Sequence, residues 1–346
     1  MPARYDLFVL GSGSTAFAAA IRAHDLGARI GMAERRTIGG TCANRGCLPS
    51  KNLIEAARIV HEAAEPRYPG LRPAAIGVDA PELVRQKDEV VRAYRQTRYV
   101  AVAEGLAGLD VLTGEATFES PTEVRVDGRP IEADRFLIAT GSRPAVPPIP
   151  GLERTPYLTS DLLDADEPGR LTEVPGSLVV LGGGYVAVEL AQLFARLGSQ
   201  VAVVARSGLL SDHEPEIRSV LEATFRAEGI AVLAGTRTLE VRGTDREVRV
   251  EVETPDGRRS VRAERLVVAT GRTPNTDRLG LERAGVRTDR DGFVAVDAEL
   301  RTSQPHIWAA GDVIGRQHGS QMATPVGARQ GRLVADNALG GARLRF

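Results

Sequence analysis

Near the N-terminus, runs of several apolar residues are separated by runs of small or polar residues, and apolar and polar residues do not alternate one by one. An apolar run at residues 5–10 is followed by a glycine-rich turn at 11–16, an alanine-rich segment to about Leu26, and a second apolar run at 29–33. Uninterrupted apolar runs of this length are typical of strands buried on both faces of a parallel sheet. The pattern predicts a strand–helix–strand unit whose second strand ends at Glu34.

The same pattern occurs a second time, near the middle of the chain. Residues 177–181 form an apolar run and residues 182–187 a glycine-rich turn. A helix to about Leu197 and a strand at 200–204 are expected to follow. This second strand is followed by Arg206, where the first unit has an acid. Self-similarity on this scale predicts a duplicated domain, not a short repeat.

The segments after each unit also correspond to each other. Each leads through further strands to an Ala-Thr-Gly turn, at residues 139–141 and again at 269–271. The proline-rich residues 144–150 are typical of a linker. Helices are predicted at about 47–64 and 81–104. The remaining predicted elements are strands at 110–117, 123–126, 135–138 and 306–310, a hairpin turn at 127–128, a strand meander over 231–268, and helices at about 215–228 and 324–339.

These elements predict an α/β fold with two Rossmann-like dinucleotide-binding domains, the second inserted into the first. The expected boundaries are 1–145 and 273–346 for the first domain and 146–272 for the second.

Composition narrows the class of protein. The 346 residues carry a net charge of -1 and only 4% aromatic side chains, so neither polyanion attraction nor base stacking is indicated. No basic-then-apolar signal segment begins the chain, and no uninterrupted apolar run approaches the length of a membrane span. We therefore expect a cytoplasmic protein with no nucleic-acid or membrane partner.

The only two cysteines, Cys42 and Cys47, lie in the glycine-rich stretch 39–51, where a helix is predicted to begin. A structural disulfide is expected to close a longer loop, and a metal site would need more Cys or His nearby. The positive end of a helix dipole lowers the pKa of a thiol, and Lys51 adds a positive charge one turn further on. We interpret the pair as a redox-active dithiol, with a pair of inert buried thiols as the alternative.

Both glycine-rich turns match the dinucleotide-binding fingerprint, whose glycines let a pyrophosphate approach a helix N-terminus. Glu34 can bond the ribose hydroxyls of the first nucleotide. Arg206 suits a 2′-phosphate, which favours NADPH over NADH in the second site. Two nucleotide sites and one dithiol indicate electron transfer from NADPH to FAD and on to Cys42 and Cys47.

Together these motifs resemble the class I pyridine nucleotide–disulfide oxidoreductases. The resemblance rests on the cysteine stretch, the two fingerprints, the two Ala-Thr-Gly turns and residues 309–312, and it covers essentially the whole chain. Within the family the chain is most similar to the mercuric reductase branch. The stretches that carry this similarity are residues 147–152, 189–199, 225–230 and 268–276.

The resemblance implies a role for each residue of the redox centre. Cys47 would be the thiol beside the flavin and Cys42 the interchange thiol that attacks the substrate. Lys51 would lie near flavin N5 and pair with Glu189. Tyr185 would cover the flavin until nicotinamide displaces it. Plain packing for Tyr185 and a solvent-facing position for Glu189 are the alternatives.

The resemblance also implies the cofactor-binding residues. Asp312 would bond the ribityl chain of FAD, and the backbone of residues 323–326 would face the flavin ring. The FAD set is Gly11, Gly13, Ser14, Thr15, Ala16, Glu34, Gly40, Thr41, Thr140, Gly141, Asp312, Ala323 and Thr324. The NADPH set is Gly182, Gly184, Tyr185, Val186, Glu189, Arg206 and Gly271. Because Hg(II) is a soft ion that prefers thiolates, only Cys42 and Cys47 could bind it, and then as substrate.

The chain departs from the family pattern by the motifs that it lacks. Family members continue into a dimer-forming domain with a His-and-Glu pair, and the mercuric branch adds a vicinal cysteine pair; neither motif occurs in this sequence. We expect a native homodimer formed through a domain outside this chain, with a small molecule or metal ion as substrate. The expected activity is NADPH-driven, FAD-dependent reduction of Hg(II). The alternatives are a dihydrolipoamide dehydrogenase or other disulfide reductase, and a flavin-binding fragment without turnover.

Overall fold

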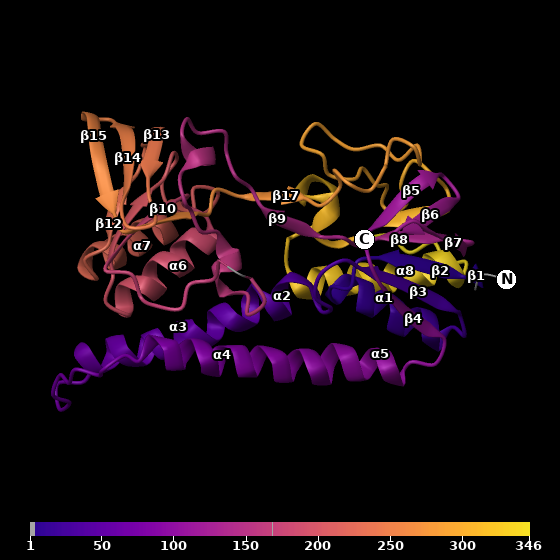
Figure 1. Cartoon of the computed structure of the whole chain (residues 1–346), viewed down its shortest axis with the longest axis horizontal. Helices are drawn as coiled ribbons and strands as arrows, with labels where there is room; N and C mark the ends of the chain where they lie inside the picture. The colour runs from indigo at the N-terminus through magenta and orange to yellow at the C-terminus, as the bar shows by residue number, and fades with distance from the viewer. Residues whose placement is uncertain (1–3, 168) are drawn as a thin grey trace. The chain divides into compact units, whose positions relative to one another are not determined.

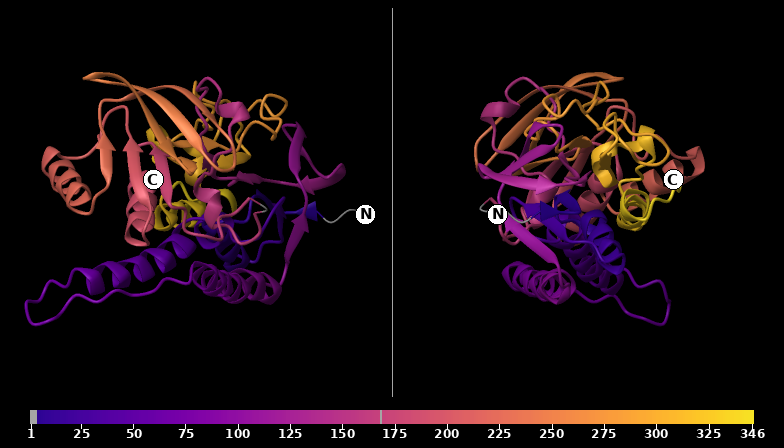
Figure 2. Two further views of the ribbon diagram at one scale, coloured as in Figure 1. Left: turned by 60° about the vertical axis from the view of Figure 1, so that its left-hand side comes forward. Right: turned by 90° about the vertical axis from the view of Figure 1, so that its right-hand side faces the viewer.

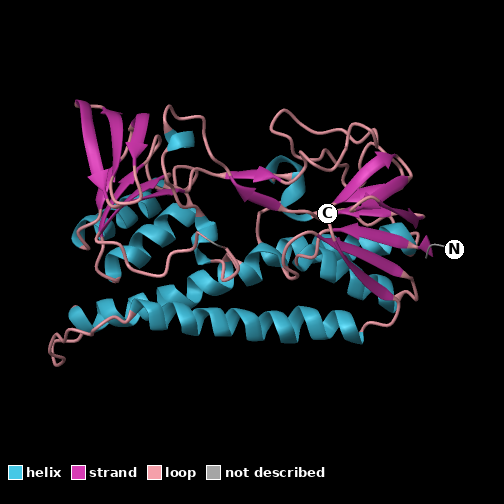
Figure 3. Ribbon diagram, viewed as in Figure 1, coloured by secondary structure: helices cyan, strands magenta, loops and turns pink. Residues whose placement is uncertain are grey.

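The structure is a computed structural model that describes residues 4–167 and 169–346. Two compact units divide the chain. One holds residues 1–44, 92–143 and 272–346, and the other holds residues 45–91 and 144–271. Each unit contains both helices and strands (Figure 3).

A five-stranded parallel sheet forms the centre of the first unit, with strand order β18-β8-β2-β3-β4 (Figure 1). Helix α1 packs against β2 and β3, and α8 packs against α1. The contact between the two helices is close, because a Cβ added to Gly331 would collide with the carbonyl oxygen of Thr15. The bounds are β2 Leu7–Leu10, α1 Ser14–Asp25, β3 Ile30–Glu34, β4 Leu109–Thr113, β8 Phe136–Ile138, β18 Ile307–Ala309 and α8 Thr324–Leu339.

A second, smaller sheet of the first unit has the order β1-β7-β6-β5. Its β6–β7 hairpin turns at Asp127 and Gly128, both with positive φ, which is the backbone that an Asp-Gly hairpin turn adopts. The predicted hairpin is therefore confirmed. The bounds are β1 Arg4–Tyr5, β5 Ala116–Ser120, β6 Glu123–Val126 and β7 Arg129–Ala133.

The second unit is built on a parallel sheet of order β12-β11-β10-β16. Side chains alternate along its strands: Leu178 and Val180 join a core with α3, α6 and α7, whereas Val179 and Leu181 join a core with an antiparallel meander. The meander strands β13, β14 and β15 are the long orange strands in Figure 2. The bounds are β10 Ser177–Leu181, α6 Tyr185–Arg196, β11 Gln200–Val204, α7 Pro215–Ala227, β12 Ala231–Leu233, β13 Arg237–Gly243, β14 Val248–Thr254, β15 Gly257–Ala263 and β16 Arg265–Val268.

Two long helical segments follow the cysteine stretch. Helix α3 spans Cys47–Ala64, and the loop after it returns alongside it, with the Ala74 N–H donating to the Ala63 carbonyl at 2.8 Å (Figure 2). Helix α4 (Ala80–Arg95) continues through one π-helical turn, η1 (Gln96–Val100), into α5 (Ala101–Gly105). Both helices are where the sequence predicts them; the π turn is not evident from the sequence.

Several short elements complete the fold. The chain passes between the two units at the paired strands β9 and β17. The predicted strand 110–117 is wrong as a single element, because Gly114, at φ 149°, ends β4 and the chain joins the other sheet as β5. The short elements are α2 Gly40–Asn44, β9 Ser142–Pro144, η2 Leu152–Arg154, η3 Ser160–Leu163, β17 Arg272–Pro274, η4 Gly311–Ile314 and η5 Arg316–His318.

The compact units and the expected cofactor domains differ in one segment. Residues 45–91 pack with the second unit, whereas the sequence assigns them to the first cofactor domain. Compactness and cofactor binding are different properties, so the domain boundaries by cofactor stay a prediction. Within residues 4–167 and 169–346, no helix has the length and apolar character needed to cross a bilayer.

Candidate active site

The first glycine-rich turn joins β2 to α1 through backbone that only glycine accommodates. Gly11 has φ 106°, and a Cβ there would lie 2.5 Å from the carbonyl oxygen of Ala139 in the Ala-Thr-Gly turn. Gly13 precedes α1 and offers no side-chain cap, so the N–H groups of Ser14, Thr15 and Ala16 open the helix without a side-chain acceptor from that residue. Such a helix start is suited to bind a phosphate.

A short hydrogen-bonded chain runs from this turn to the end of β3 and to the cysteine stretch. The hydroxyl of Ser12 donates to Oε2 of Glu34 at 2.6 Å, and the N–H of Gly39 donates to the Ser12 hydroxyl at 3.3 Å. The other carboxylate oxygen of Glu34 accepts from the N–H of Arg36 at 2.8 Å. Ser12 is 1% exposed, and sequence reasoning gave it no role because a serine in the turn carries no signal of its partner.

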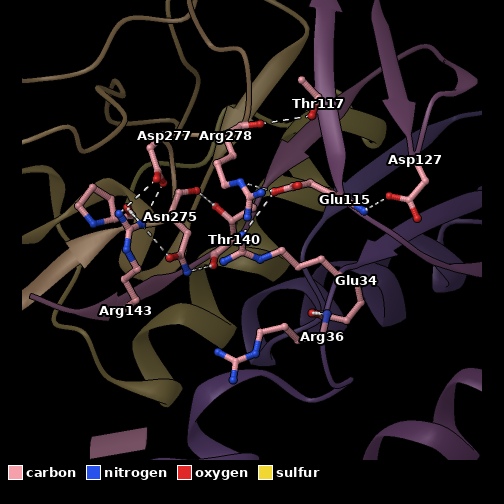
Figure 4. Close-up of polar contacts among 12 residues, drawn as sticks. Glu34, Arg36, Glu115, Thr117, Asp127, Thr140, Arg143, Asn275, Asp277 and Arg278 are labelled. Atoms are coloured by element: carbon pink, nitrogen blue, oxygen red, sulfur yellow. Dashed lines mark hydrogen bonds and ion pairs between the residues drawn. The ribbon is translucent and has the colours of Figure 1, made fainter. Parts of the chain in front are cut away.

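Glu34 faces a recess at the carboxyl end of the first sheet (Figure 4). Glu115 forms ion pairs with Arg35 at 3.4 Å and Arg278 at 3.2 Å on the wall of this recess. Thr140 and Asn275 exchange two hydrogen bonds at 2.8 and 2.9 Å beside it. The charged wall thus joins segments from three separate parts of the first unit.

Cys42 belongs to the first unit and lies half-buried in α2, next to Thr41. The turn before it is held against the fingerprint, because a Cβ on Gly40 would lie 2.6 Å from Cα of Gly13. The buried side chain of Asn44 donates to the carbonyls of Ile38 and Gly40 at 3.0 and 2.9 Å. Asn44 therefore fixes the turn that presents Cys42, a role that the sequence alone did not reveal.

Cys47 belongs to the second unit and is the first residue of α3. It is exposed, whereas Cys42 is half-buried. The helix is capped by Gly46 without a side-chain bond, and Pro49 lies in its first turn, where proline is well tolerated. An 18-residue helix that begins at a thiol favours its thiolate form.

Lys51 and Glu189 form an ion pair within the second unit. Lys51 Nζ donates to both carboxylate oxygens of Glu189 at 2.6 Å, which joins α3 to α6. Since the side chains are 57% and 38% exposed, the pair contributes little to stability and more to the position of the ammonium group.

The second fingerprint repeats the geometry of the first. Gly182 has φ 125°, and a Cβ there would collide with the carbonyl oxygen of Ala269, which again belongs to an Ala-Thr-Gly turn. Gly271 ends that turn with φ 143°, and Gly184 precedes α6 without a side-chain cap. Exposed Val186 follows in the first turn of α6. Both units thus present a helix N-terminus over bare glycine backbone.

The loop after β11 folds over this fingerprint. Leu210 donates its N–H to the Gly183 carbonyl at 2.7 Å, and the loop begins with exposed Arg206. Tyr185 is 53% exposed, and its hydroxyl lies 2.6 Å from Nε2 of His213 in the same loop. His213 was not predicted as a site residue, because its position after Asp212 gives no sign of the contact.

Asp312 lies in η4 of the first unit, at the end of β18. Ser142 donates its hydroxyl to Oδ2 of Asp312 at 2.8 Å and accepts from Nε of Arg272 at 2.7 Å. Ser142 and Arg272 are the residues that directly follow the two Ala-Thr-Gly turns, and these contacts bring both of them to Asp312. Ala323 caps α8, whose first residue is Thr324, so a third helix N-terminus belongs to the first unit.

No group of three or more His, Cys, Asp or Glu side chains in residues 4–167 and 169–346 is arranged to hold a metal ion.

Comparisons with known proteins agree with this geometry. The sequence profile of a family described as pyridine nucleotide-disulphide oxidoreductase matches residues 5–331. A mercuric reductase of Streptomyces lividans is 45% identical over 344 residues, which cover 98% of this chain and 70% of that protein. One of Staphylococcus aureus is 40% identical over 343 residues, covering 99% of this chain and 61% of that protein. The chain spans 60% of the length of the Lysinibacillus sphaericus mercuric reductase, close to the 61% of the Staphylococcus aureus protein.

Solved structures give the same result. The HOCl-induced flavoprotein disulfide reductase RclA from Escherichia coli superposes with a TM-score of 0.84 at 29% identity, covering 99% of this chain and 72% of that one. A Cu(II) complex of RclA matches with the same TM-score at 28% identity. The predicted α/β fold with two dinucleotide-binding domains is confirmed by this likeness.

Proposed function

Because the chain belongs to the pyridine nucleotide-disulphide oxidoreductase family, we propose that it is an NADPH-driven, FAD-dependent reductase with Cys42 and Cys47 as its redox dithiol. In this proposal residues 1–145 and 273–346 bind FAD, and residues 146–272 bind NADPH. When bound, FAD would accept one hydride, which carries two electrons, and deliver the two electrons to a disulfide. The chain's own residues bind, orient and protect these groups.

The residues present fit a dinucleotide in each unit. In the first, the uncapped start of α1 would hold the FAD pyrophosphate, and Glu34, kept in place by Ser12, would accept from the ribose hydroxyls. Asp312 would accept from the ribityl chain, and the N-terminus of α8 at Ala323 would face the ring. In the second unit, the uncapped start of α6 and the exposed Arg206 would hold NADPH.

The two thiols have unequal roles in this proposal. Cys47 starts an 18-residue helix, which favours a stable thiolate beside the flavin. Cys42 would be the interchange thiol that meets the substrate. Lys51 would hold its ammonium near the flavin, oriented by Glu189, and Tyr185 would close over the nicotinamide face until the nucleotide enters.

Hg(II) is the proposed substrate. Relatives called mercuric reductase are 37–45% identical over nearly the whole chain, and this likeness carries the assignment. Hg(II) is a soft ion for which thiolates are the preferred ligands, and the chain has two. The balanced reaction takes two electrons from NADPH, which leaves as NADP⁺ and a proton, and converts Hg²⁺ to Hg⁰.

Two alternatives have their own support. A disulfide substrate is favoured by the likeness to RclA, which is described as a flavoprotein disulfide reductase. A flavin-binding fragment without turnover is favoured because the chain spans only 60% and 61% of the length of two mercuric reductases that it matches.

Anaerobic NADPH oxidation with three separate acceptors tests the proposal. With Hg(II), lipoamide and glutathione disulfide as acceptors, we expect turnover with Hg(II) that is lost in Cys42→Ser. Turnover with a disulfide and none with Hg(II) supports the first alternative. Reduction of bound flavin by NADPH without turnover on any acceptor supports the second.

We further propose a cytoplasmic homodimer that forms through a domain outside this chain. The family membership supports this. Sedimentation of the full gene product and of residues 1–346 would give a dimer and a monomer, respectively; a dimer from both would place the interface within this chain.

A further inference from the structure

A groove lies along one edge of the parallel sheet in the second unit. Its walls come from the end of α7, from β12 and from β15, which all lie at one end of this unit (Figure 1). Its volume is about 530 Å³, which is within the usual range of small-molecule sites. The described residues that line it include no member of the proposed NADPH set. We call this hollow the edge groove.

Two sheet edges border the edge groove. Within residues 4–167 and 169–346, β12 pairs only with β11, and β15 pairs only with β14. Each is therefore the last strand of its sheet on this side, and no further strand of the described chain lies over the groove. The core between the parallel sheet and the meander reaches solvent here.

The floor of the edge groove is apolar. Leu233 of β12 is 7% exposed and belongs to the core between the parallel sheet and the meander, and Ala202 and Val261 pack against the same core. Ile230, which is 3% exposed, belongs to the core on the other face of the sheet. All four residues line the groove. An apolar group placed here would remove partly exposed apolar surface from water, which is favourable.

Three arginines surround this floor. Arg226 lies in the last turn of α7, and Arg259 and Arg262 lie on β15. Within residues 4–167 and 169–346, no acid pairs with any of the three guanidinium groups. Glu222 is the one acid among the described residues that line the groove, and it forms no ion pair with them. The edge groove therefore has an excess of positive charge that the protein itself does not neutralise.

Arg259 occupies a position at which the strand pattern favours an apolar residue. In the pairing of β14 with β15, Arg259 lies opposite Val252 and Val261 lies opposite Val250, and both of these partners are fully buried. Side chains two positions apart in a strand share a face, so Arg259 belongs to the face that packs against the core. A cation at the margin of an apolar core, with no acid beside it, is suited to pair with an anion that enters the groove.

We infer that the edge groove binds a small organic acid, with its apolar body on the floor and its carboxylate between the arginines. Charge complementarity selects this class of ligand. A cation would meet three like charges, and a neutral ligand would leave the guanidinium groups without an acceptor. Arginine and carboxylate form paired, charge-assisted hydrogen bonds, which are the stronger kind. This site goes beyond the proposed reductase function and does not depend on it.

Isothermal titration calorimetry with cinnamate tests the inference. The full chain is used with saturating FAD and NADP⁺, so that the proposed nucleotide sites are filled. We expect cinnamate to bind with one site per chain, and cinnamyl alcohol, which has the same ring but no charge, to bind at least about tenfold more weakly. Acetate has the charge without the ring and should bind too weakly to measure. No binding of cinnamate, or equal binding of the acid and the alcohol, would overturn the inference.

Variants locate the binding. We expect Arg259→Gln to weaken cinnamate binding about tenfold, and Glu222→Gln to strengthen it about two- to threefold because a like charge is removed from the groove. Arg258→Gln is the matched control: Arg258 is the neighbouring arginine on β15, pairs with Glu253 at 3.5 Å and does not line the groove. Equal losses in Arg258→Gln and Arg259→Gln would show general attraction of anions to the surface and would overturn the inference.

Discussion

The hydroxyl of Tyr185 lies 2.6 Å from Nε2 of His213, and the two rings meet at 64° with their centroids 5.2 Å apart. Tyr185 is the first residue of α6, and His213 lies in the loop between β11 and α7, which also holds Arg206. The contact therefore connects Tyr185, which is proposed to close over the flavin until the nucleotide enters, to the loop proposed to recognise the 2′-phosphate.

Removing this contact should weaken nucleotide binding. We expect Tyr185→Phe and His213→Gln each to raise the dissociation constant of NADP⁺ about two- to tenfold, since one hydrogen bond contributes about 0.5–1.5 kcal/mol. The double variant should bind no more weakly than either single variant, because both remove the same bond. Isothermal titration calorimetry measures all three, with Tyr157→Phe as the control for an exposed tyrosine of the same unit. Fully additive effects would show that the two side chains act separately.

Glu115 should matter for retention of FAD. Its ion pairs with Arg35 and Arg278 hold two walls of the recess that Glu34 faces (Figure 4). We expect Glu115→Gln to release FAD about two- to fivefold faster in flavin-fluorescence dissociation assays, because the wall loses two charged contacts. Glu119→Gln is the matched control, as Glu119 pairs with Arg283 outside the recess. Equal loss of FAD from both variants would mean that general weakening, not the recess, is responsible.

The close approach of Gly182 to the backbone of Ala269 should affect the free energy of unfolding. Gly182 and Gly198 both have positive φ, at 125° and 111°, but only at Gly182 would a Cβ collide with backbone, at Ala269. We expect Gly198→Ala to lower the free energy of unfolding by about 1–2 kcal/mol through backbone strain alone, and Gly182→Ala to lower it by several kcal/mol more. Urea denaturation compares them. Similar losses would show that the Ala-Thr-Gly turn can move aside.

Gly182 and Gly198 also show how much of the fold could be predicted from the sequence. Block alternation and glycine positions predicted both strand–helix–strand units, because a buried parallel strand needs an apolar run and the close approach needs a residue without Cβ. The single strand predicted at 110–117 was wrong, since Gly114 redirects the chain and an apolar pattern does not show which sheet a strand joins.

The site was predictable only in its local part. Motif spacing placed Cys42 and Cys47, but Ser12 and His213 gave no signal. Their partners Glu34 and Tyr185 lie 22 and 28 positions away, as the residue numbers show, and a single sequence contains no information on such pairs. The ion pair of Lys51 with Glu189, 138 positions apart, came from the family resemblance and not from spacing.

Glu228 should give a pH-dependent contribution to stability. Burial raises the pKa of its carboxyl, but the hydrogen bonds and charge of Arg196 outweigh this and hold the pKa below its ordinary value. A lowered carboxyl pKa stabilises the fold above the ordinary glutamate pKa, and this stabilisation is lost as the pH falls through the lowered pKa.

We expect Glu228→Gln to lower the free energy of unfolding by about 1–3 kcal/mol at pH 7, with the difference from the parent shrinking towards pH 3. Urea denaturation across this range measures it. Glu222→Gln, on helix α7, which Glu228 follows directly, is the control, because within residues 4–167 and 169–346 no ion pair of Glu222 is found. A difference that grows on acidification would contradict the assigned sign.

The central claim is that electrons from NADPH reach Cys47 as the thiol beside the flavin. Anaerobic reduction of the FAD-loaded chain by two electrons per flavin tests this most directly, with absorbance recorded beyond the flavin bands. We expect a long-wavelength charge-transfer band in the two-electron-reduced parent, where the electrons rest on the dithiol and the flavin stays oxidised, and no such band in Cys47→Ser. Cys42→Ser has no disulfide to reduce, so it should show the band before reduction, while its flavin is oxidised. A band that persists in Cys47→Ser would contradict the account.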